Sequence, residues 1–106
     1  MTKQRFLVVY EHGKRNYGGF APDIPGCIST GKTLKKMREM MREALEFHLE
    51  GMAEGGDAMP TPVTNSVDFK DLDDIDEGKV DHYVVEWLEI EVPTSGQVRN
   101  ELANEQ

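Results

Sequence analysis

The alternation of apolar and polar residues predicts a strong strand near each end of the chain. Residues 5–11 read RFLVVYE and place apolar side chains on both faces of an extended chain, which is typical of a strand that is covered on both sides or paired centrally. Residues 82–92 read HYVVEWLEIEV, and Glu86 interrupts one of their two apolar rows. We therefore expect the later strand to lie at a sheet edge or to contain a local bulge.

Two shorter strands are predicted soon after the first one. Residues 12–16 have the composition of a turn and residues 17–21 that of a strand, so the first unit is a hairpin. The sequence PDIPG at 22–26 cannot continue regular structure, because its two prolines lack N–H donors. Residues 27–30 then form a short third strand, which completes an antiparallel meander.

From Thr33 the apolar period changes from two residues to about 3.6, which predicts a long amphipathic helix. Thr33 is suited to the N-cap position, and Gly51, Gly55 and Gly56 mark the end of the pattern. A helix of this length spans roughly 30 Å and can lie across a whole sheet. The predicted fold class is therefore α+β, an antiparallel β-β-β-α-β arrangement with one long helix packed on one face of the sheet.

Residues 57–81 hold two prolines and eight acidic residues and are expected to be mostly a surface linker. Within them, Val67 and Phe69 are expected to form a brief strand or to anchor the loop. The tail, 94–106, is expected to contain a short helix starting at Ser95. The predicted organisation is one domain over 1–93, with an acidic insertion at 63–81, followed by that tail.

Composition narrows the class of protein. A chain of 106 residues is long enough for one domain with a core but too short for two. No apolar run approaches the roughly 18 residues of a membrane span. The single cysteine cannot form an internal disulfide, and a cytoplasmic location is the simplest expectation.

The net charge of −8 is concentrated in the second half of the chain. Residues 1–50 carry nine basic and six acidic side chains, a net of +3, whereas residues 51–106 carry three and fourteen, a net of −11. Acidic groups repel phosphates, so we expect no direct nucleic-acid binding, and a basic protein partner fits better. The alternative is an ordinary solvated surface. The candidate partner-binding residues are Asp71, Asp73, Asp74, Asp76 and Glu77.

One short motif invites a functional reading that its context does not support. The string GCISTGKT at 26–33 matches the Gly-x₄-Gly-Lys-Thr pattern of a phosphate-binding loop. Its middle residues have the composition of a strand, Pro25 stands directly before it, and the strand–helix alternation of a nucleotide-binding fold does not follow. We therefore reject nucleotide binding.

The remaining reactive side chains do not form a recognisable site in the sequence. His12, His48 and His82 are scattered over a turn, a helix and a strand start, without metal-ligand spacing. Cys27 is best explained as a small buried hydrophobe. We therefore assign no catalytic, cofactor-binding or metal-binding residue and expect no cofactor.

Three stretches taken together resemble the N-terminal domain of HicB-family antitoxins. They are YGGFAPDIPGCISTGKT at 17–33, the helix ending in EALEFHLEG, and the MPTP that follows. The resemblance covers about residues 5–62 and includes the final strand, and the combined string is more specific than any of its parts. The structural turn residues in this stretch are Asp23, Pro25, Gly26 and Gly31. We expect Asp23 to cap the turn, and we expect the two glycines to be required by the backbone conformation.

This resemblance implies a partial, ribonuclease-H-like domain that has lost nuclease chemistry. It also implies a non-enzymatic antitoxin that neutralises a HicA-like toxin, a small basic mRNA-cleaving protein, by direct binding. We further expect a homodimer or higher homo-oligomer, through an exposed strand edge or a face carrying Met40 and Phe47. The residues from Pro93 onward are too few for the DNA-binding module of many members, so a stand-alone domain is expected.

Two alternatives stay open at the level of sequence. One is an interaction domain of the same family that has no toxin partner. The other is a residual metal-dependent nuclease, which needs several carboxylates to converge on its cations. The carboxylates available for that role are Glu11, Asp23 and Asp81.

Overall fold

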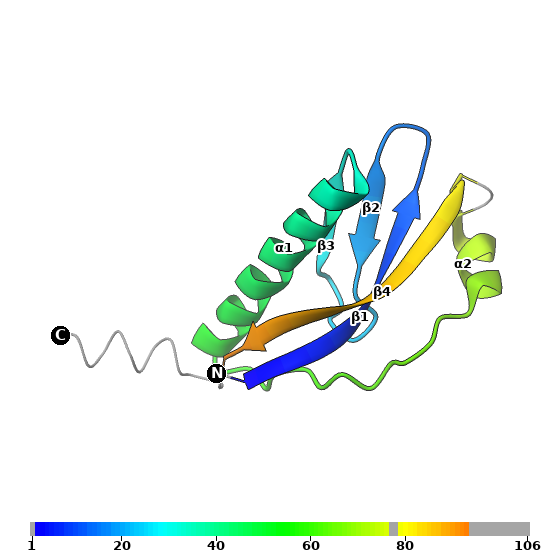
Figure 1. The fold of residues 1–106 in the computed structure, drawn as a ribbon. Coiled ribbons are helices and arrows are strands. Elements are labelled where there is room, and N and C mark those ends of the chain that lie inside the picture. Colours follow the sequence, from blue (N-terminus) through cyan, green and yellow to red (C-terminus); the bar gives the residue numbers. More distant parts are fainter. Residues whose placement is uncertain (1, 77–78, 94–106) are drawn as a thin grey trace.

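Strand β1 (Thr2–His12) lies in the middle of a four-stranded antiparallel sheet, between β2 and β4 (Figure 1). The computed structural model describes residues 2–76 and 79–93, with side chains for all of these except 73–76. Every side chain from Phe6 to Tyr10 is buried, on both faces of β1. The strand is therefore central and covered on both sides, as its two apolar rows predict.

The other strands are β2 (Tyr17–Phe20), β3 (Ile28–Gly31) and β4 (His82–Val92), and the sheet order is β3-β2-β1-β4. Strand β4 pairs with β1 over its whole length, from Val92 opposite Thr2 to His82 opposite His12. It lies at an edge of the sheet, so the expected edge position is confirmed. The alternative, a local bulge, is wrong, because the ladder continues through Glu86 without an inserted residue.

Helix α1 (Leu34–Glu54) packs on one face of the sheet, and the predicted α+β class is confirmed (Figure 1). The Thr33 hydroxyl accepts a hydrogen bond from the backbone N–H of Lys36 at 3.1 Å, which makes Thr33 the N-cap. Gly55 is the C-cap, and Gly56 follows with φ of 79°. The side chains that α1 buries are Met37, Met41, Leu45, Leu49 and Ala53.

Gly31, the last residue of β3, allows the start of α1 to approach the sheet very closely. A Cβ atom on Gly31 would lie 2.6 Å from the backbone nitrogen of Met37 and 2.7 Å from its Cα. A backbone cannot move aside as the end of a flexible side chain can, so this contact requires glycine. Gly26, in the turn after Pro25, has φ of 85°, a left-handed conformation that also favours glycine.

Asp23 ties the linker after α1 to the turn between β2 and β3. Its Oδ2 accepts hydrogen bonds from the backbone N–H groups of Val63 and Thr64, both at 2.9 Å, and its Oδ1 accepts from the Thr64 hydroxyl at 2.6 Å. These bonds hold the pKa of Asp23 below its ordinary value, although burial alone would raise it. In the described part of the chain, this carboxylate holds a segment distant in sequence and makes no hydrogen bond to its own turn.

A second helix, α2 (Phe69–Asp76), occupies part of the segment that we expected to be mostly linker. Asp68 Oδ1 accepts from the Lys70 backbone N–H at 3.0 Å and so acts as an N-cap. The Phe69 ring packs against Tyr83 of β4 with centroids 5.6 Å apart, so its role as an anchor is confirmed. A helix of eight residues is marginal alone. The sequence pattern did not predict α2, because the packing of Phe69 against Tyr83 is a tertiary contact.

Two expectations fall on parts of the chain outside the described residues. They are the short helix starting at Ser95, within the tail 94–106, and the contribution of Glu77 to the acidic surface.

The contact at Gly31 predicts a large difference between two glycine substitutions in the same sheet. Gly31→Ala should lower the free energy of unfolding by about 1–3 kcal/mol, because its Cβ would force α1 away from β3. Gly18→Ala is the matched control, since a Cβ there meets nothing within 4 Å, and its effect should stay within about 0.5 kcal/mol. Urea denaturation of both variants measures the difference. Equal effects would contradict the tight packing of α1 on β3.

Candidate functional site

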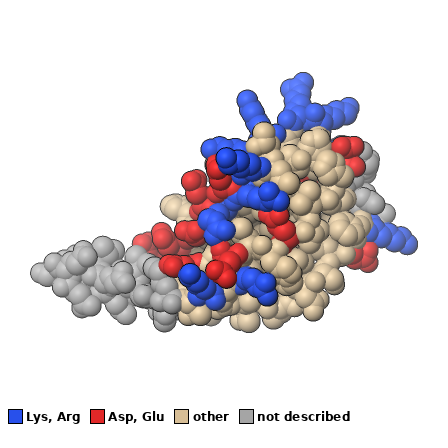
Figure 2. All heavy atoms as spheres, viewed as in Figure 1, with Lys and Arg blue, Asp and Glu red and all other residues tan. Residues whose placement is uncertain are grey.

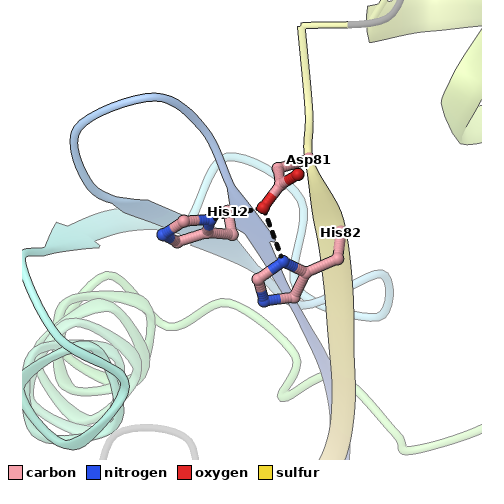
Figure 3. A group of neighbouring side chains, drawn as sticks. All are labelled: His12, Asp81 and His82. Carbon is pink, nitrogen blue, oxygen red and sulfur yellow. Dashed lines mark hydrogen bonds and ion pairs between the residues drawn. The ribbon is translucent and has the colours of Figure 1, made fainter.

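Two histidines and an aspartate meet at the end of the sheet where β1 stops and β4 begins (Figure 3). Asp81 Oδ2 lies 3.2 Å from Nδ1 of His12 and 3.1 Å from Nδ1 of His82. The two imidazole rings are stacked with centroids 4.6 Å apart, and the Tyr17 ring lies 4.6 Å from that of His12. One carboxylate oxygen therefore serves two imidazoles, and we call these three residues the His-Asp-His cluster.

The register of the sheet assembles this cluster. His12 and His82 are directly opposite each other in the β1–β4 ladder, so their side chains share one face of the sheet. The backbone N–H of Asp81 donates to the carbonyl of His12 at 2.7 Å, which holds Asp81 beside the end of β1. Asp81 lies in a bend before β4, and its carboxylate reaches the same two rings that the ladder aligns.

The charges around the cluster are mixed. Hydrogen bonds from His82 and His12 hold the pKa of the Asp81 carboxyl below its ordinary value. A hollow of about 330 Å³ beside the cluster is lined by His12, Gly13, Lys14, Lys79 and Asp81. The arrangement offers two nitrogen ligands and one oxygen ligand to a cation, and the two lysines add positive charge at the rim.

The cluster is not evident from the sequence, because His12 and His82 are far apart in the chain. Metal-ligand spacing is a signal for ligands on one element, whereas here each histidine stands at the end of a different strand. The sequence does contain a different indication of the cluster. His12 and His82 stand at the ends of the two strongest predicted strands, and antiparallel pairing of those strands end to end brings the histidines together.

A second polar contact joins α1 to the edge strand. Arg38 donates hydrogen bonds from Nε to both carboxylate oxygens of Glu86, at 2.8 and 3.1 Å, and from Nη2 to Oε2 at 2.9 Å. Burial alone would raise the pKa of Glu86, but the Arg38 hydrogen bonds and charge hold it below its ordinary value. This pair explains how β4 accommodates a charged residue in the row that faces the helix.

The edge of β4 is partly protected by the same helix. The Arg42 guanidinium donates a hydrogen bond to the backbone carbonyl of Glu89. On the opposite face, the Arg5 guanidinium lies 5.7 Å from the ring centre of Trp87, which is 45% exposed. Charged side chains at an edge strand discourage pairing with another chain, and both sides of β4 carry them.

Four of the predicted acidic residues belong to α2. Asp71 lies in the first turn of α2 and is exposed, and Asp73, Asp74 and Asp76 belong to the same helix. Negative charge near a helix N-terminus is favourable, so Asp71 stabilises the start of α2.

The three carboxylates proposed for a residual nuclease do not come together: Asp23 follows β2, whereas Asp81 lies beside the hairpin at the other end of that strand.

The molecule also carries a basic end and isolated exposed apolar side chains. Lysines and arginines gather where the β1–β2 hairpin and the start of α1 lie (Figure 2). These are the exposed residues Lys14, Arg15, Lys32, Lys35 and Lys36. Phe47, on α1, is 79% exposed, and Ile28, on β3, is 76% exposed.

The chain belongs to a known family. Residues 6–94 match the sequence model of the HicB_like antitoxins of bacterial toxin-antitoxin systems. This match covers the sheet from Phe6 onward, both helices and the His-Asp-His cluster. Family membership, expected from the stretch at 17–33, is therefore confirmed.

Two relatives match about half of the chain. One is an uncharacterized 14.9 kDa protein from the rep-hol intergenic region of Haemophilus phage HP1, 40% identical over 56 residues. The other is a UPF0150 protein of Thermotoga maritima, 37% identical over 51 residues. Each match covers 48% of this chain, and they span 42% and 64% of the two relatives.

Solved structures of HicB proteins have the same fold. The N-terminal domain of the Burkholderia pseudomallei antitoxin HicB is 24% identical, with a TM-score of 0.60 over 84% of this chain and 100% of that one. A chain of a HicA3 and HicB3 toxin-antitoxin complex is 20% identical, with a TM-score of 0.55 over 85% of this chain and 99% of that one. At these identities the likeness establishes the fold alone.

Among the described residues, no helix combines the length and the apolar composition needed to cross a membrane.

The Arg38–Glu86 pair predicts a pH-dependent contribution to stability. The folded pKa of Glu86 lies below its ordinary value of 4.5, so its contribution is present above 4.5 and lost as the pH falls through the folded pKa. Glu86→Gln should therefore lower the free energy of unfolding by about 1 kcal/mol at neutral pH and by progressively less in acid. Urea denaturation over a pH series measures the free energy of unfolding.

Glu43→Gln, at an exposed site on α1, is the control and should change the free energy of unfolding little at any pH. A Glu86→Gln effect of constant size at all pH values would contradict the pairing.

Proposed function

We propose that this chain is the antitoxin of a type II toxin–antitoxin pair and neutralises a small, basic, HicA-like mRNA interferase by binding it directly. Membership of the HicB-like family supports this function, as does the complex of a HicA3 with a HicB3 whose fold this chain shares. The observation that carries the proposal is the acidic second half of the chain, with its net charge of −11 over 51–106. The protein then acts as a non-enzymatic inhibitor in the cytoplasm.

The acidic surface around α2 is the proposed toxin-binding site. A ribonuclease that holds RNA must present cationic side chains to the phosphates. An acidic helix competes for those same cations, and opposite fields also accelerate the encounter of the two proteins. The residues that we assign to this surface are Asp71, Asp73, Asp74, Asp76 and Glu77. In this proposal, residues 1–93 form the ribonuclease-H-like antitoxin domain and 63–81 are its acidic insertion.

The first experiment is co-expression of this chain with the small basic protein encoded beside its gene. The expected result is a stable complex on purification and suppression of the RNA cleavage and growth arrest that the toxin causes alone. If no small basic ribonuclease is encoded nearby and none is captured, the antitoxin proposal fails. The chain would then be an interaction domain of the family without a toxin.

Neutralising the acidic surface tests where the toxin binds. Changing Asp71, Asp73, Asp74 and Asp76 to Asn and Glu77 to Gln should reduce the association rate at least tenfold at low salt, because complementary fields dominate that rate. The matched control removes five charges from α1 instead, by changing Glu39, Glu43, Glu46, Glu50 and Glu54 to Gln. Stopped-flow or surface-plasmon measurements compare the two variants. A larger effect of the control would place the toxin on α1.

The nuclease alternative is disfavoured by the separation of its carboxylates. Asp23 binds the linker through Val63 and Thr64, and Asp81 binds the two histidines at the other end of β2. An assay for RNA cleavage with Mg²⁺ discriminates the two functions. Cleavage that is abolished by Asp23→Asn would replace the antitoxin proposal with the enzymatic one.

We also propose a homodimer or higher homo-oligomer, formed through an exposed strand edge or through the face of α1 that carries Met40 and Phe47. Phe47→Ser should shift the assembly toward monomer if the helix face is used, because a 79% exposed phenylalanine gains most from burial. Ile28→Ser, at a similarly exposed site on β3, is the control. Light scattering over a concentration series measures the mass. An oligomer that survives Phe47→Ser would exclude the helix face and leave an exposed strand edge, and a monomeric wild-type chain would refute the assembly.

A further inference from the structure

The His-Asp-His cluster has the composition and the spacing of a metal-binding site. One ligand atom from each of His12, Asp81 and His82 lies within 4.8 Å of the other two. Figure 3 shows one ring nitrogen of each histidine turned toward the carboxylate of Asp81. We propose that these three residues bind one divalent transition-metal ion, of which Zn²⁺ fits best.

The distances suit a small tetrahedral ion. Bonds of about 2.0–2.1 Å from zinc to imidazole nitrogen and to carboxylate oxygen put neighbouring ligand atoms roughly 3.3 Å apart. Asp81 Oδ2 lies 3.2 and 3.1 Å from the two Nδ1 atoms, so both nitrogen–oxygen edges of such a tetrahedron already have nearly the required length. An ion placed between the three atoms replaces the protons that these hydrogen bonds now share.

The donor set selects the class of ion. Neutral imidazole binds Zn²⁺, Cu²⁺ and Ni²⁺ well, whereas Mg²⁺ and Ca²⁺ require oxygen ligands. Each neutral histidine can carry its proton on Nε2, which leaves the Nδ1 lone pair free for the metal. Two nitrogens and one oxygen therefore favour a transition metal, and solvent can occupy the fourth position.

The fold holds the ligands in place before any metal arrives. His12 and His82 are fixed by the ladder between β1 and β4, and the hydrogen bond from the Asp81 backbone to the His12 carbonyl fixes the third ligand. The ring of Tyr17 packs at 4.6 Å from His12 and 6.2 Å from His82, which restrains both rings. Two of the three ligands, His12 and His82, stand on paired strands, where side chains are held more precisely than on loops.

Two lysines near the cluster disfavour the binding of a metal cation. Lys14 and Lys79 line the same hollow as His12 and Asp81. Their charge weakens the attraction of the site for a bare cation, but both are exposed, so solvent screens them. They also favour an anion as the fourth ligand. The site is accordingly one of moderate affinity rather than a structural zinc site on which folding depends.

The test uses the full chain without an affinity tag, stripped of metal with a chelator. Titration calorimetry with Zn²⁺ should give one saturable site per chain, and Co²⁺ should produce the visible absorption of a tetrahedral complex. His12→Gln, His82→Gln and Asp81→Asn should each weaken Zn²⁺ binding at least tenfold, since even outer-shell changes cost about 10–100-fold. His48→Gln is the matched control, because His48 lies on α1 away from the cluster, and should leave the affinity unchanged.

A measurement on the wild-type chain keeps the test independent of whether the variants fold. In NMR spectra, Co²⁺ should broaden the imidazole signals of His12 and His82 at one equivalent while leaving His48 sharp. Absence of saturable binding would overturn the proposal, as would equal broadening of all three histidines or undiminished affinity in the His12→Gln and His82→Gln variants. None of these readouts uses a toxin, so the outcome is separate from that of the antitoxin proposal.

Discussion

The pairing of β1 with β4 is the constraint on which the rest of the molecule depends. It joins the second residue of the chain to Val92 and His12 to His82 in one uninterrupted antiparallel ladder. Because side chains alternate between faces, a slip of one residue would move every side chain of β4 to the wrong face of the sheet. The register therefore decides which residues of β4 meet the helix, and it brings together the two histidines at the end of the ladder.

The close approach of α1 to β3, at the edge of the sheet opposite β4, is a second constraint. Gly31 lets the backbone of α1 come closer to β3 than any side chain would permit. At that distance Met37 and Met41 are buried over Gly19 of β2, and Arg38 reaches across to Glu86 on β4. The helix thus contacts both edges of the sheet, and one charged pair is stabilised at the margin of an otherwise apolar interface.

A basic group and the acidic segment lie at different places in the fold. Five of the nine basic side chains of the first half gather at the hairpin and the start of α1 (Figure 2), whereas the acidic segment follows the linker to α2 beside β4 (Figure 1). Asp23 and Phe69 are the contacts that hold this segment to the sheet, through Thr64 and Tyr83 respectively. A basic partner would therefore meet a surface whose position is set by specific contacts, these two among them, rather than by the charge alone.

The sequence alone determined the strands, the long helix, its caps and the family. Each of these rests on a local signal: the period of apolar residues for β1, α1 and β4, the hydroxyl of Thr33 for the cap, and a continuous string at 17–33 for the family. Only the tertiary structure decided the rest. Helix α2 depends on the packing of Phe69 against Tyr83, and Asp23 binds a linker some forty positions later in the chain. The His-Asp-His cluster exists because an antiparallel ladder brings two strand ends together. These features depend on contacts between residues distant in sequence, and local periodicity carries no information about which distant residues will meet.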